Sequence, residues 1–322
     1  MLIKYIPSFS KYAAMALTLL ASSVMAEEEI SLRLGDVKGD RYASLVASGE
    51  LESLPYKLEL TTFAAGAPVL EALNAGALDV GFTGDIPFLF VRAAGAPVKA
   101  VGAWRYNTET VAIVVNDDSD IESIQDLVGK RIAVNRGGWG HFMALGALER
   151  AEMSIDDVEF AFLGPVDGRA ALNRHSVDAW VPWEPYTSSA ILLDNSRVIE
   201  TGDGIMTGYS YALAHEDAIE SKQGAIQDLL LRLARAQQWA LENPNEFAQQ
   251  LANTLELPIE VAERWVAQAR ISPATIDSDV VNSLQVAADF FHRHKVLPVA
   301  VDVSDAFDTS FATWLRAQES FP

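Results

Sequence analysis

A short apolar strand, a polar or glycine-rich turn and a helix follow one another repeatedly along this chain. Strand patterns occupy residues 30–35, 56–63, 78–82 and 98–104, and helical patterns follow the first three at 41–48, 69–75 and 86–94. Strands and helices that alternate in units of this length predict a parallel, doubly wound sheet. In such a sheet, ligands bind beyond the carboxyl ends of the strands.

A second series of the same kind predicts a second lobe. A polar turn at 116–120 follows the apolar run 111–115, and strands are then expected at 131–135, 158–163 and 178–182. The apolar run 210–214 is interpreted as the chain crossing back. We therefore expect an α/β fold of two lobes, each with a mainly parallel, doubly wound sheet. Residues 27–114 and 209–322 would form lobe I with extra C-terminal helices, and residues 115–208 would form lobe II across a hinged cleft.

The first 26 residues have the pattern of a secretory signal peptide. Lys4 and Lys11 precede an apolar run at 13–21, and small residues occupy the cleavage positions up to Ala26. The alternative, a membrane anchor, would need about 20 consecutive apolar residues, and this run is shorter. We therefore expect an exported, soluble protein of the periplasm.

Charge and cysteine content exclude several classes of function. Two of the 24 basic residues and none of the 44 acidic residues lie in the signal peptide, so the mature chain has a net charge of −22. This charge argues against nucleic acid or anionic lipid as a partner. The absence of cysteine excludes disulfides, thiolate metal sites and cysteine nucleophiles. His292 and His294 lack further ligands nearby, and no cofactor motif occurs, so we expect neither a metal nor a cofactor.

Three strand–turn–helix junctions, with turns at 36–40, 83–85 and 135–141, are candidate anion sites. Residues 131–134 end at a glycine-containing turn, and a helical pattern begins at Trp139. The first N–H groups of a helix have no partner within it and lie at the positive end of its dipole, where they attract anions. Residues 36–40 and 83–85 have the same construction in the first series. An ordinary connecting turn is the alternative for any one junction considered alone.

Three groups of motifs resemble those of a known family over nearly the whole mature chain. They are residues 70–76, 79–81 and 83–85, then 127–135 with His141, then 177–180 with 183–186. In this order and spacing, they resemble the substrate-binding proteins of aliphatic sulfonate and taurine ABC importers. The resemblance implies a type II periplasmic binding protein fold, a small sulfonate ligand, a membrane permease as partner and no enzymatic activity. Two departures are the turn 137–140, which lacks small hydroxyl residues, and Glu184, where the family usually has Asp.

A sulfonate remains ionised at any relevant pH, so its site must supply hydrogen-bond donors. From lobe I we expect the Thr83 hydroxyl and the amides of Gly84 and Asp85, with the Asp85 side chain capping the helix. From lobe II we expect the amides of Gly138 and Gly140. Donors from both lobes would favour closure of the cleft, because the closed state then makes contacts that the open state lacks.

Three further candidates would complete the walls of the site. Lys38, at the end of the first strand, is either a counter-charge or a solvated loop lysine. Trp139 and Trp183 are expected to form apolar walls around an alkyl chain or an aromatic face for a cation. Core packing is the alternative for Trp183.

Polar candidates in lobe II and at the crossing have similar alternatives. Glu184 would receive an ammonium group, as taurine requires, or is a surface carboxylate. His141 would donate a hydrogen bond to the anion, or it has a structural role in helix capping or core packing. Tyr209 lines the cleft just before the returning strand.

Other functions remain open from the sequence. The same fold binds other small solutes, such as nitrate, a thiamine-precursor pyrimidine or another sulfur compound. Desulfinases and pyrimidine synthases also resemble this fold, but their chemistry depends on cysteines that this chain lacks. A sensory module that binds a ligand and then docks on a receptor is a further alternative. We expect a monomeric transport protein.

Overall fold

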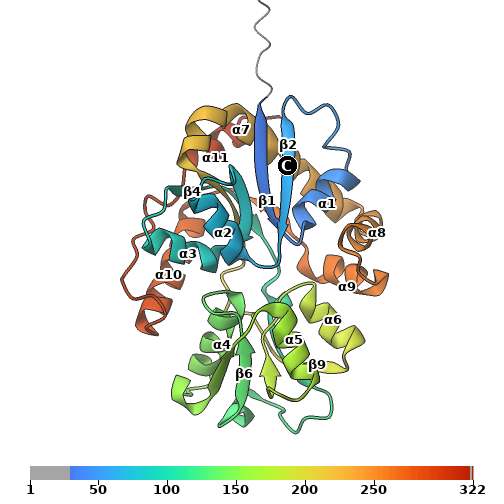
Figure 1. Ribbon diagram of the computed structural model, residues 1–322, viewed down its shortest axis with the longest axis vertical. Helices are drawn as coiled ribbons and strands as arrows, with labels where there is room; N and C mark the ends of the chain where they lie inside the picture. The colour runs from blue at the N-terminus through green and yellow to red at the C-terminus, as the bar shows by residue number, and fades with distance from the viewer. Residues whose placement is uncertain (1–29, 320, 322) are drawn as a thin grey trace, which may run out of the picture.

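The computed structural model describes residues 30–319 and 321, so the predicted signal peptide lies outside the described residues. The described chain forms two lobes, each built around one sheet (Figure 1). The six-stranded sheet of lobe I has the order β11-β4-β10-β3-β1-β2, and the five-stranded sheet of lobe II has the order β7-β6-β8-β5-β9. The predicted two-lobed α/β fold is thus confirmed.

Four strands of lobe I run in one direction: β1 (Ser31–Val37), β2 (Lys57–Phe63), β3 (Val80–Gly84) and β4 (Val98–Arg105). β10 (Tyr209–His215) lies between β3 and β4 and is antiparallel to both. β11 (Ser272–Ala274) pairs with β4 at the edge of the sheet. The chain therefore returns from lobe II into the middle of this sheet.

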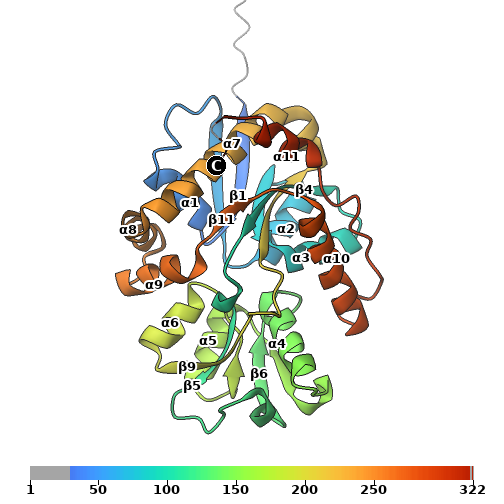
Figure 2. The same ribbon diagram turned by 180° about the vertical axis from the view of Figure 1, so that it is seen from behind.

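Helices cover both faces of the lobe I sheet, as the two opposite views show (Figures 1 and 2). On one face lie α2 (Gly66–Asn74), α3 (Asp85–Ala93) and α10 (Ser278–Arg293), and on the other lie α1 (Asp40–Ala47), α7 (Glu216–Glu242) and α11 (Thr309–Arg316). α8 (Pro244–Leu255) and α9 (Ile259–Ala269) pack beside α1 and α7. The predicted apolar stripe of α7, which includes Ile226, Leu229, Leu230 and Leu233, is buried against the sheet.

Lobe II contains β5 (Ala112–Asn116), β6 (Arg131–Val134), β7 (Glu159–Phe162), β8 (Ala179–Trp180) and β9 (Ser196–Thr201). α4 (Trp139–Arg150) covers one face of this sheet, and α5 (Pro165–Asn173) and α6 (Tyr186–Leu193) cover the other. The short helices η1 (Thr108–Thr110), η2 (Ile124–Leu127) and η3 (Ile155–Asp157) lie in connections. β6 is parallel to β7 and β8, whereas β5 is antiparallel to β8 and β9.

The chain changes sheet between β4 and β5 and again between β9 and β10. Because β5 pairs only within lobe II, the boundary that we placed after residue 114 falls inside a strand and not in the connection before it. An apolar strand such as β5 could pair with either sheet. The sequence pattern of β5 therefore could not show where the chain passes from lobe I to lobe II. The sequence reasoning also missed β9, β11 and α6.

The lobes also touch away from these connections. Phe290 and Phe291 of α10 pack on Phe142 of α4, with ring centroids 4.8 and 5.3 Å apart. Lobe I therefore contacts lobe II on the side of α3 and α4, and α9 of lobe I packs against α6 of lobe II on the other side. Both contacts flank the space between the two sheets.

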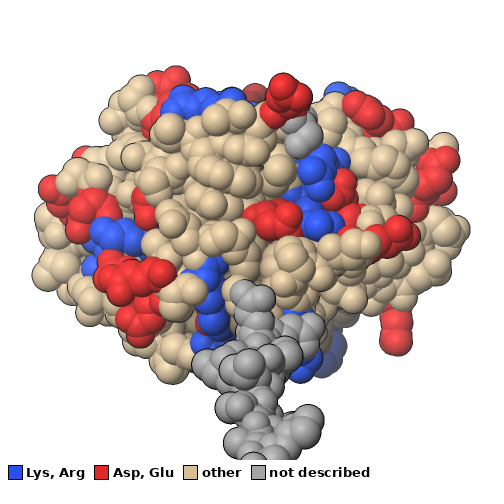
Figure 3. Space-filling model, turned by 90° about the horizontal axis from the view of Figure 1, so that it is seen from above, with Lys and Arg blue, Asp and Glu red and all other residues tan. Residues whose placement is uncertain are grey.

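The surface seen from above carries small groups of acidic and basic side chains between uncharged ones (Figure 3). No group of one sign dominates this face. Among the described residues, no helix combines the length and the apolarity that crossing a bilayer requires.

Candidate functional site

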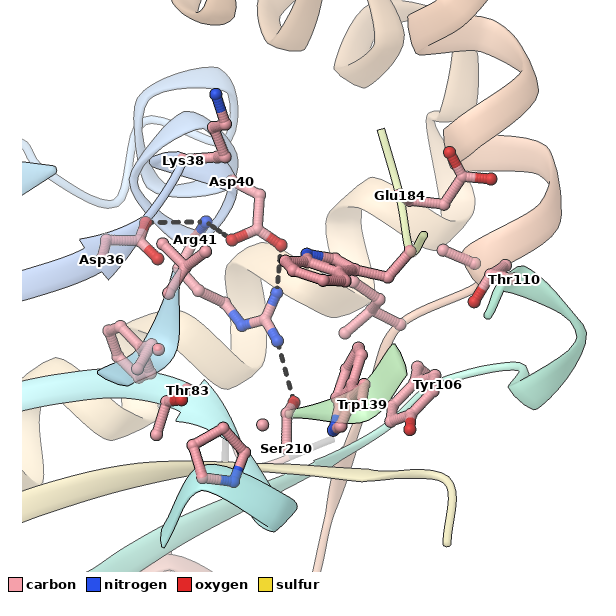
Figure 4. Close-up of a pocket in the computed structure, with 18 of the residues that line it drawn as sticks. Asp36, Lys38, Asp40, Arg41, Thr83, Tyr106, Thr110, Trp139, Glu184 and Ser210 are labelled. Atoms are coloured by element: carbon pink, nitrogen blue, oxygen red, sulfur yellow. Dashed lines mark hydrogen bonds and ion pairs between the residues drawn. The ribbon is translucent and has the colours of Figure 1, made fainter. Parts of the chain in front are cut away.

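A cavity lies between the lobes at the carboxyl ends of the lobe I strands (Figure 4). Its open space is about 850 Å³ when the mouth is included, which is within the range of small-molecule sites. From lobe I, its polar lining comprises Asp36, Lys38, Asp40, Arg41, Thr83 and Ser210. From lobe II and the connection to it come Asn135, Trp139, Trp183, Glu184, Thr110 and Tyr106.

The junction of β3 and α3 forms one wall of the cavity. Thr83 and Gly84 both line it, and Gly84 is the N-cap of α3. The Thr83 hydroxyl is buried and has no hydrogen-bond partner. Gly84 is required by close packing, because a Cβ atom there would lie 2.4 Å from the indole nitrogen of Trp139. This wall therefore offers an unengaged hydroxyl next to a helix N-terminus.

Asp85 does not line the cavity. As the first residue of α3, it is fully buried, and its carboxylate accepts hydrogen bonds from the Trp139 indole N–H at 2.9 Å and from the Thr207 hydroxyl. Burial raises the pKa of Asp85 to about 6, and these donors oppose the rise. Gly84 holds the N-cap position, but the Asp85 carboxylate also accepts a hydrogen bond from the Ile86 amide at 2.8 Å, so it engages the first turn of the helix as expected. The same side chain joins lobe I to lobe II.

In the segment before and at the start of α4, only Trp139 of our candidates lines the cavity. Trp139 stacks on Tyr106 with ring centroids 4.3 Å apart. Gly138 is the N-cap of α4, and the Gly140 amide donates to the side-chain oxygen of Asn135 at 3.1 Å. The structure therefore places Gly138 and Gly140 behind the cavity wall, where the Gly140 amide is already engaged.

His141 also lies outside the cavity. It is buried, and its Nδ1 accepts a hydrogen bond from the Gly137 amide at 3.3 Å. Its ring packs against Phe160, Phe162 and Phe291. Burial, followed by the charge of Arg136, lowers the pKa of His141 to about 4. A neutral, capped imidazole fits the alternative of capping and packing that the sequence left open.

Arg41 is a cavity residue that the sequence reasoning missed. It lies at the start of α1, and its guanidinium reaches Asp40 Oδ2 at 2.5 Å and donates to Ser210 Oγ at 3.0 Å. The side chain is buried, although arginine is mostly exposed in proteins. Asp36 accepts hydrogen bonds from the amides of Arg41 and Tyr42, each at 3.1 Å. The polar turn 36–40 was expected at this edge of the sheet, but neither Asp36 nor Arg41 was named as a site residue.

Lys38 lines the cavity and is half-buried. Its ammonium lies 5.1 Å from the centroid of the Tyr186 ring, which belongs to lobe II. This cation–π contact links the two lobes at the mouth of the cavity. Lys38 has φ of 63°, so its backbone is left-handed and turns the chain into α1.

Trp183 and Glu184 form the lobe II wall. Trp183 packs edge-to-face against Tyr186, with centroids 5.8 Å apart. The Glu184 carboxylate accepts hydrogen bonds from the Ser188 hydroxyl at 2.9 Å and from its amide at 3.2 Å. Burial raises the pKa of Glu184 to about 7, and the Ser188 donors oppose the rise.

Tyr209 does not line the cavity. It is buried, and its hydroxyl accepts a hydrogen bond from Arg105 at 2.5 Å. The pair His292 and His294 is also engaged elsewhere, since His294 binds Glu149 at 2.7 Å. Within the described residues, no group of three or more His, Asp or Glu side chains is arranged to hold a metal ion.

The chain passes twice between two sheets, and a polar cavity lies between them. This arrangement is that of the two-lobed periplasmic binding proteins. A family model described as NMT1/THI5 like matches residues 57–247. The chain belongs to this NMT1/THI5-like family.

Solved structures and a curated relative agree with this assignment. The periplasmic aliphatic sulphonate binding protein of Escherichia coli is 32% identical, with a TM-score of 0.78, over 86% of this chain and 92% of its own. The alkanesulfonate-binding protein of Xanthomonas axonopodis pv. citri, solved bound to MOPS, is 31% identical, with a TM-score of 0.81, over 88% of this chain and 99% of its own. The taurine-binding periplasmic protein of Escherichia coli is 25% identical over 61% of each chain. The resemblance inferred from the motifs is confirmed.

Proposed function

We propose that this protein is a periplasmic solute-binding protein that captures a small sulfonate, an alkanesulfonate or taurine, and delivers it to the permease of an ABC importer. The observation that carries the proposal is the cavity between the lobes, where buried donors of lobe I face two tryptophans of lobe II. The relatives named for sulfonate and taurine binding support the same ligand class. They are binding proteins, so we infer capture of the ligand and not its chemical conversion.

The lining suggests how such a ligand would be held. Sulfonate oxygens accept hydrogen bonds, and the Thr83 hydroxyl, the amides at the start of α3 and the Arg41 guanidinium are the donors at the lobe I wall. The organic part would then lie against Trp139 and Trp183. Under this proposal the anion is bound mainly by lobe I, and lobe II contributes walls and Glu184 in place of the amides of Gly138 and Gly140.

The expected location follows from the sequence and the relatives together. Residues 1–26 carry the signal peptide pattern, and the relatives include periplasmic proteins. We propose that the mature chain begins after Ala26, acts in the periplasm as a monomer and binds neither nucleic acid nor a cofactor.

A zwitterionic aminosulfonate is the ligand that Glu184 favours. Glu184 belongs to the lobe II part of the lining, whereas Arg41 and Thr83 belong to the lobe I part. The two ends of taurine would therefore meet opposite charges on the two lobes. A plain alkanesulfonate would leave Glu184 without a cationic partner.

Isothermal titration calorimetry with a solute panel tests the proposal. The panel comprises taurine, ethanesulfonate, MOPS, sulfate and nitrate, in phosphate or Tris, because many common buffers are themselves sulfonates. We expect saturable binding of at least one sulfonate, and weaker binding of sulfate and nitrate than of that sulfonate. Tight binding of nitrate or sulfate, with no heat from any sulfonate, would instead assign the protein to another solute of this fold.

A further inference from the structure

Two carboxylates at the lobe I wall share one hydrogen-bond donor. The backbone amide of Arg41 lies 3.1 Å from Asp36 Oδ2 and 2.9 Å from Asp40 Oδ1, as Figure 4 shows. Both acids line the cavity. One ionised carboxylate disfavours the ionisation of another nearby, so the charge of Asp40 makes an ionised Asp36 less favourable.

The charge of this pair is only partly compensated. Arg41 pairs with Asp40 at 2.5 Å, but Asp36 Oδ1 is buried without any donor. Asp36 is fully buried, and an ionised oxygen in that position loses its hydration without replacement. Burial, and then the charge of Asp40, raise the pKa of Asp36 well above its ordinary value, while Arg41 and its amide act in the opposite direction.

The other charged groups of the cavity lie farther along its lining. Lys38 follows Asp36 on the same loop and has its ammonium over the Tyr186 ring. Glu184 faces the cavity from lobe II. From β3 and β10, the lining residues Thr83 and Ser210 are uncharged. Of the described residues that line the cavity, three are therefore acidic and two are basic.

We propose that Asp36 holds a proton when an anion occupies this cavity, so that anion capture is coupled to proton uptake. The inference rests on the proposed function, which makes the ligand an anion. Without the proton, the anion would enter beside two ionised carboxylates and one guanidinium. With it, the pair carries one negative charge, which Arg41 balances, and the buried Arg41 Nε, which has no partner, is left as a donor.

The coupling has a defined signature. A bound anion raises the pKa of Asp36, so affinity falls with pH between the pKa of Asp36 in the free protein and its pKa in the complex. One proton per ligand gives a limiting slope of tenfold in Kd per pH unit, and affinity is constant on either side of that window.

Calorimetry with ethanesulfonate, which has no group that titrates in this range, measures the coupling directly. Binding is followed from pH 5 to 9.5, and the proton count comes from paired experiments in phosphate and Tris. We expect Kd to rise with pH toward the tenfold slope, with close to one proton taken up inside that window. A Kd and proton count that are flat across the whole range would overturn the proposal.

Asp36→Asn and Glu184→Gln assign the proton. The amide oxygen of Asp36→Asn still accepts from the amides of Arg41 and Tyr42, and its NH₂ group replaces the proton. We expect the pH slope and the proton count to be lost in Asp36→Asn and kept in Glu184→Gln. The reverse pattern would place the proton on Glu184 and overturn the proposal. Loss of all binding in Asp36→Asn at pH 5 would show that an ionised Asp36 holds a cationic part of the ligand, which also overturns it.

A measurement without ligand separates this inference from the proposed function. If no sulfonate binds to the wild type, the proposed function fails, and the melting temperature of the free protein still tests the pair. The folded pKa of Asp36 lies above its unfolded value, so the wild type loses stability relative to Asp36→Asn as pH rises from about 4. A melting difference that does not change from pH 4 to 9 would refute the proton on Asp36 itself.

Discussion

Replacing Thr83 by valine should change stability and affinity in opposite directions. The Thr83 hydroxyl is buried without a partner, and such a group costs about 1–3 kcal/mol in a folded protein. Valine has the same shape without the hydroxyl, so the free protein should become more stable by up to that amount. If the hydroxyl donates to a bound anion, the variant loses a charge-assisted hydrogen bond of about 1.5–3 kcal/mol, which weakens binding by roughly 10- to 150-fold.

Thr187 supplies a matched control for this substitution. It is equally buried, but its hydroxyl donates to the Thr110 carbonyl at 2.9 Å, and its side chain does not line the cavity. Thr187→Val should therefore lower the melting temperature, because the carbonyl loses its donor, while Kd stays within a few-fold of the wild type. Scanning calorimetry of the free proteins and titration with the tightest sulfonate measure both quantities. A Thr83→Val variant that is less stable and binds normally would show that the hydroxyl has a structural role only.

Three further substitutions test other parts of the site. Trp139→Phe keeps a ring on the cavity wall but removes the donor to Asp85, so titration should show about 10- to 150-fold weaker binding if that bond holds the lobes closed; an unchanged Kd would contradict this role. Arg41→Met leaves Asp36 and Asp40 without their cation. It should lower the free energy of unfolding by about 3–5 kcal/mol at pH 7, with partial recovery at pH 5. A urea titration that shows a loss below about 1 kcal/mol would count against this role of Arg41. Glu184 has its folded pKa near 7, above the unfolded value, so the wild type should lose stability as pH rises from about 4.5 to 7, and Glu184→Gln should gain on it by up to about 3 kcal/mol. Melting curves at pH 4.5 and 8 check this prediction: the melting temperature of Glu184→Gln minus that of the wild type must increase from pH 4.5 to pH 8.

Local patterns predicted the parts of the molecule that local physics determines. The strands β1 to β4 of lobe I and the helix that starts at Asp85 were recognised because periodicity and turn chemistry act over a few neighbouring residues. The same reasoning brought Lys38, Thr83 and Glu184 to one cavity. The carboxyl ends of neighbouring strands meet at one edge of a sheet, so their turns converge whatever their sequence.

Tertiary packing decided the rest. His141 follows a glycine turn in a way that suits either an anion donor or a cap, and the aromatic ring of Phe291, from a helix 150 residues later, is part of what buries it away from the cavity. The partner of Asp85 is Trp139, 54 residues along the chain and in the other lobe. Arg41 begins a predicted helix, and its burial depends on Ser210, which lies 169 residues later in the chain. None of these contacts leaves a mark within a short window of sequence.

The insertion of β10 between β3 and β4 has a consequence for how the molecule is assembled. Lobe II is a single continuous stretch, but the lobe I sheet has a gap until the ninety residues of lobe II, and the connection after them, have been made. Until then, β3 and β4 each expose an unpaired backbone edge of the kind that invites association with other chains. We therefore expect lobe II to be able to fold early, and a fragment that stops before Tyr209 to aggregate, however sound its local structure.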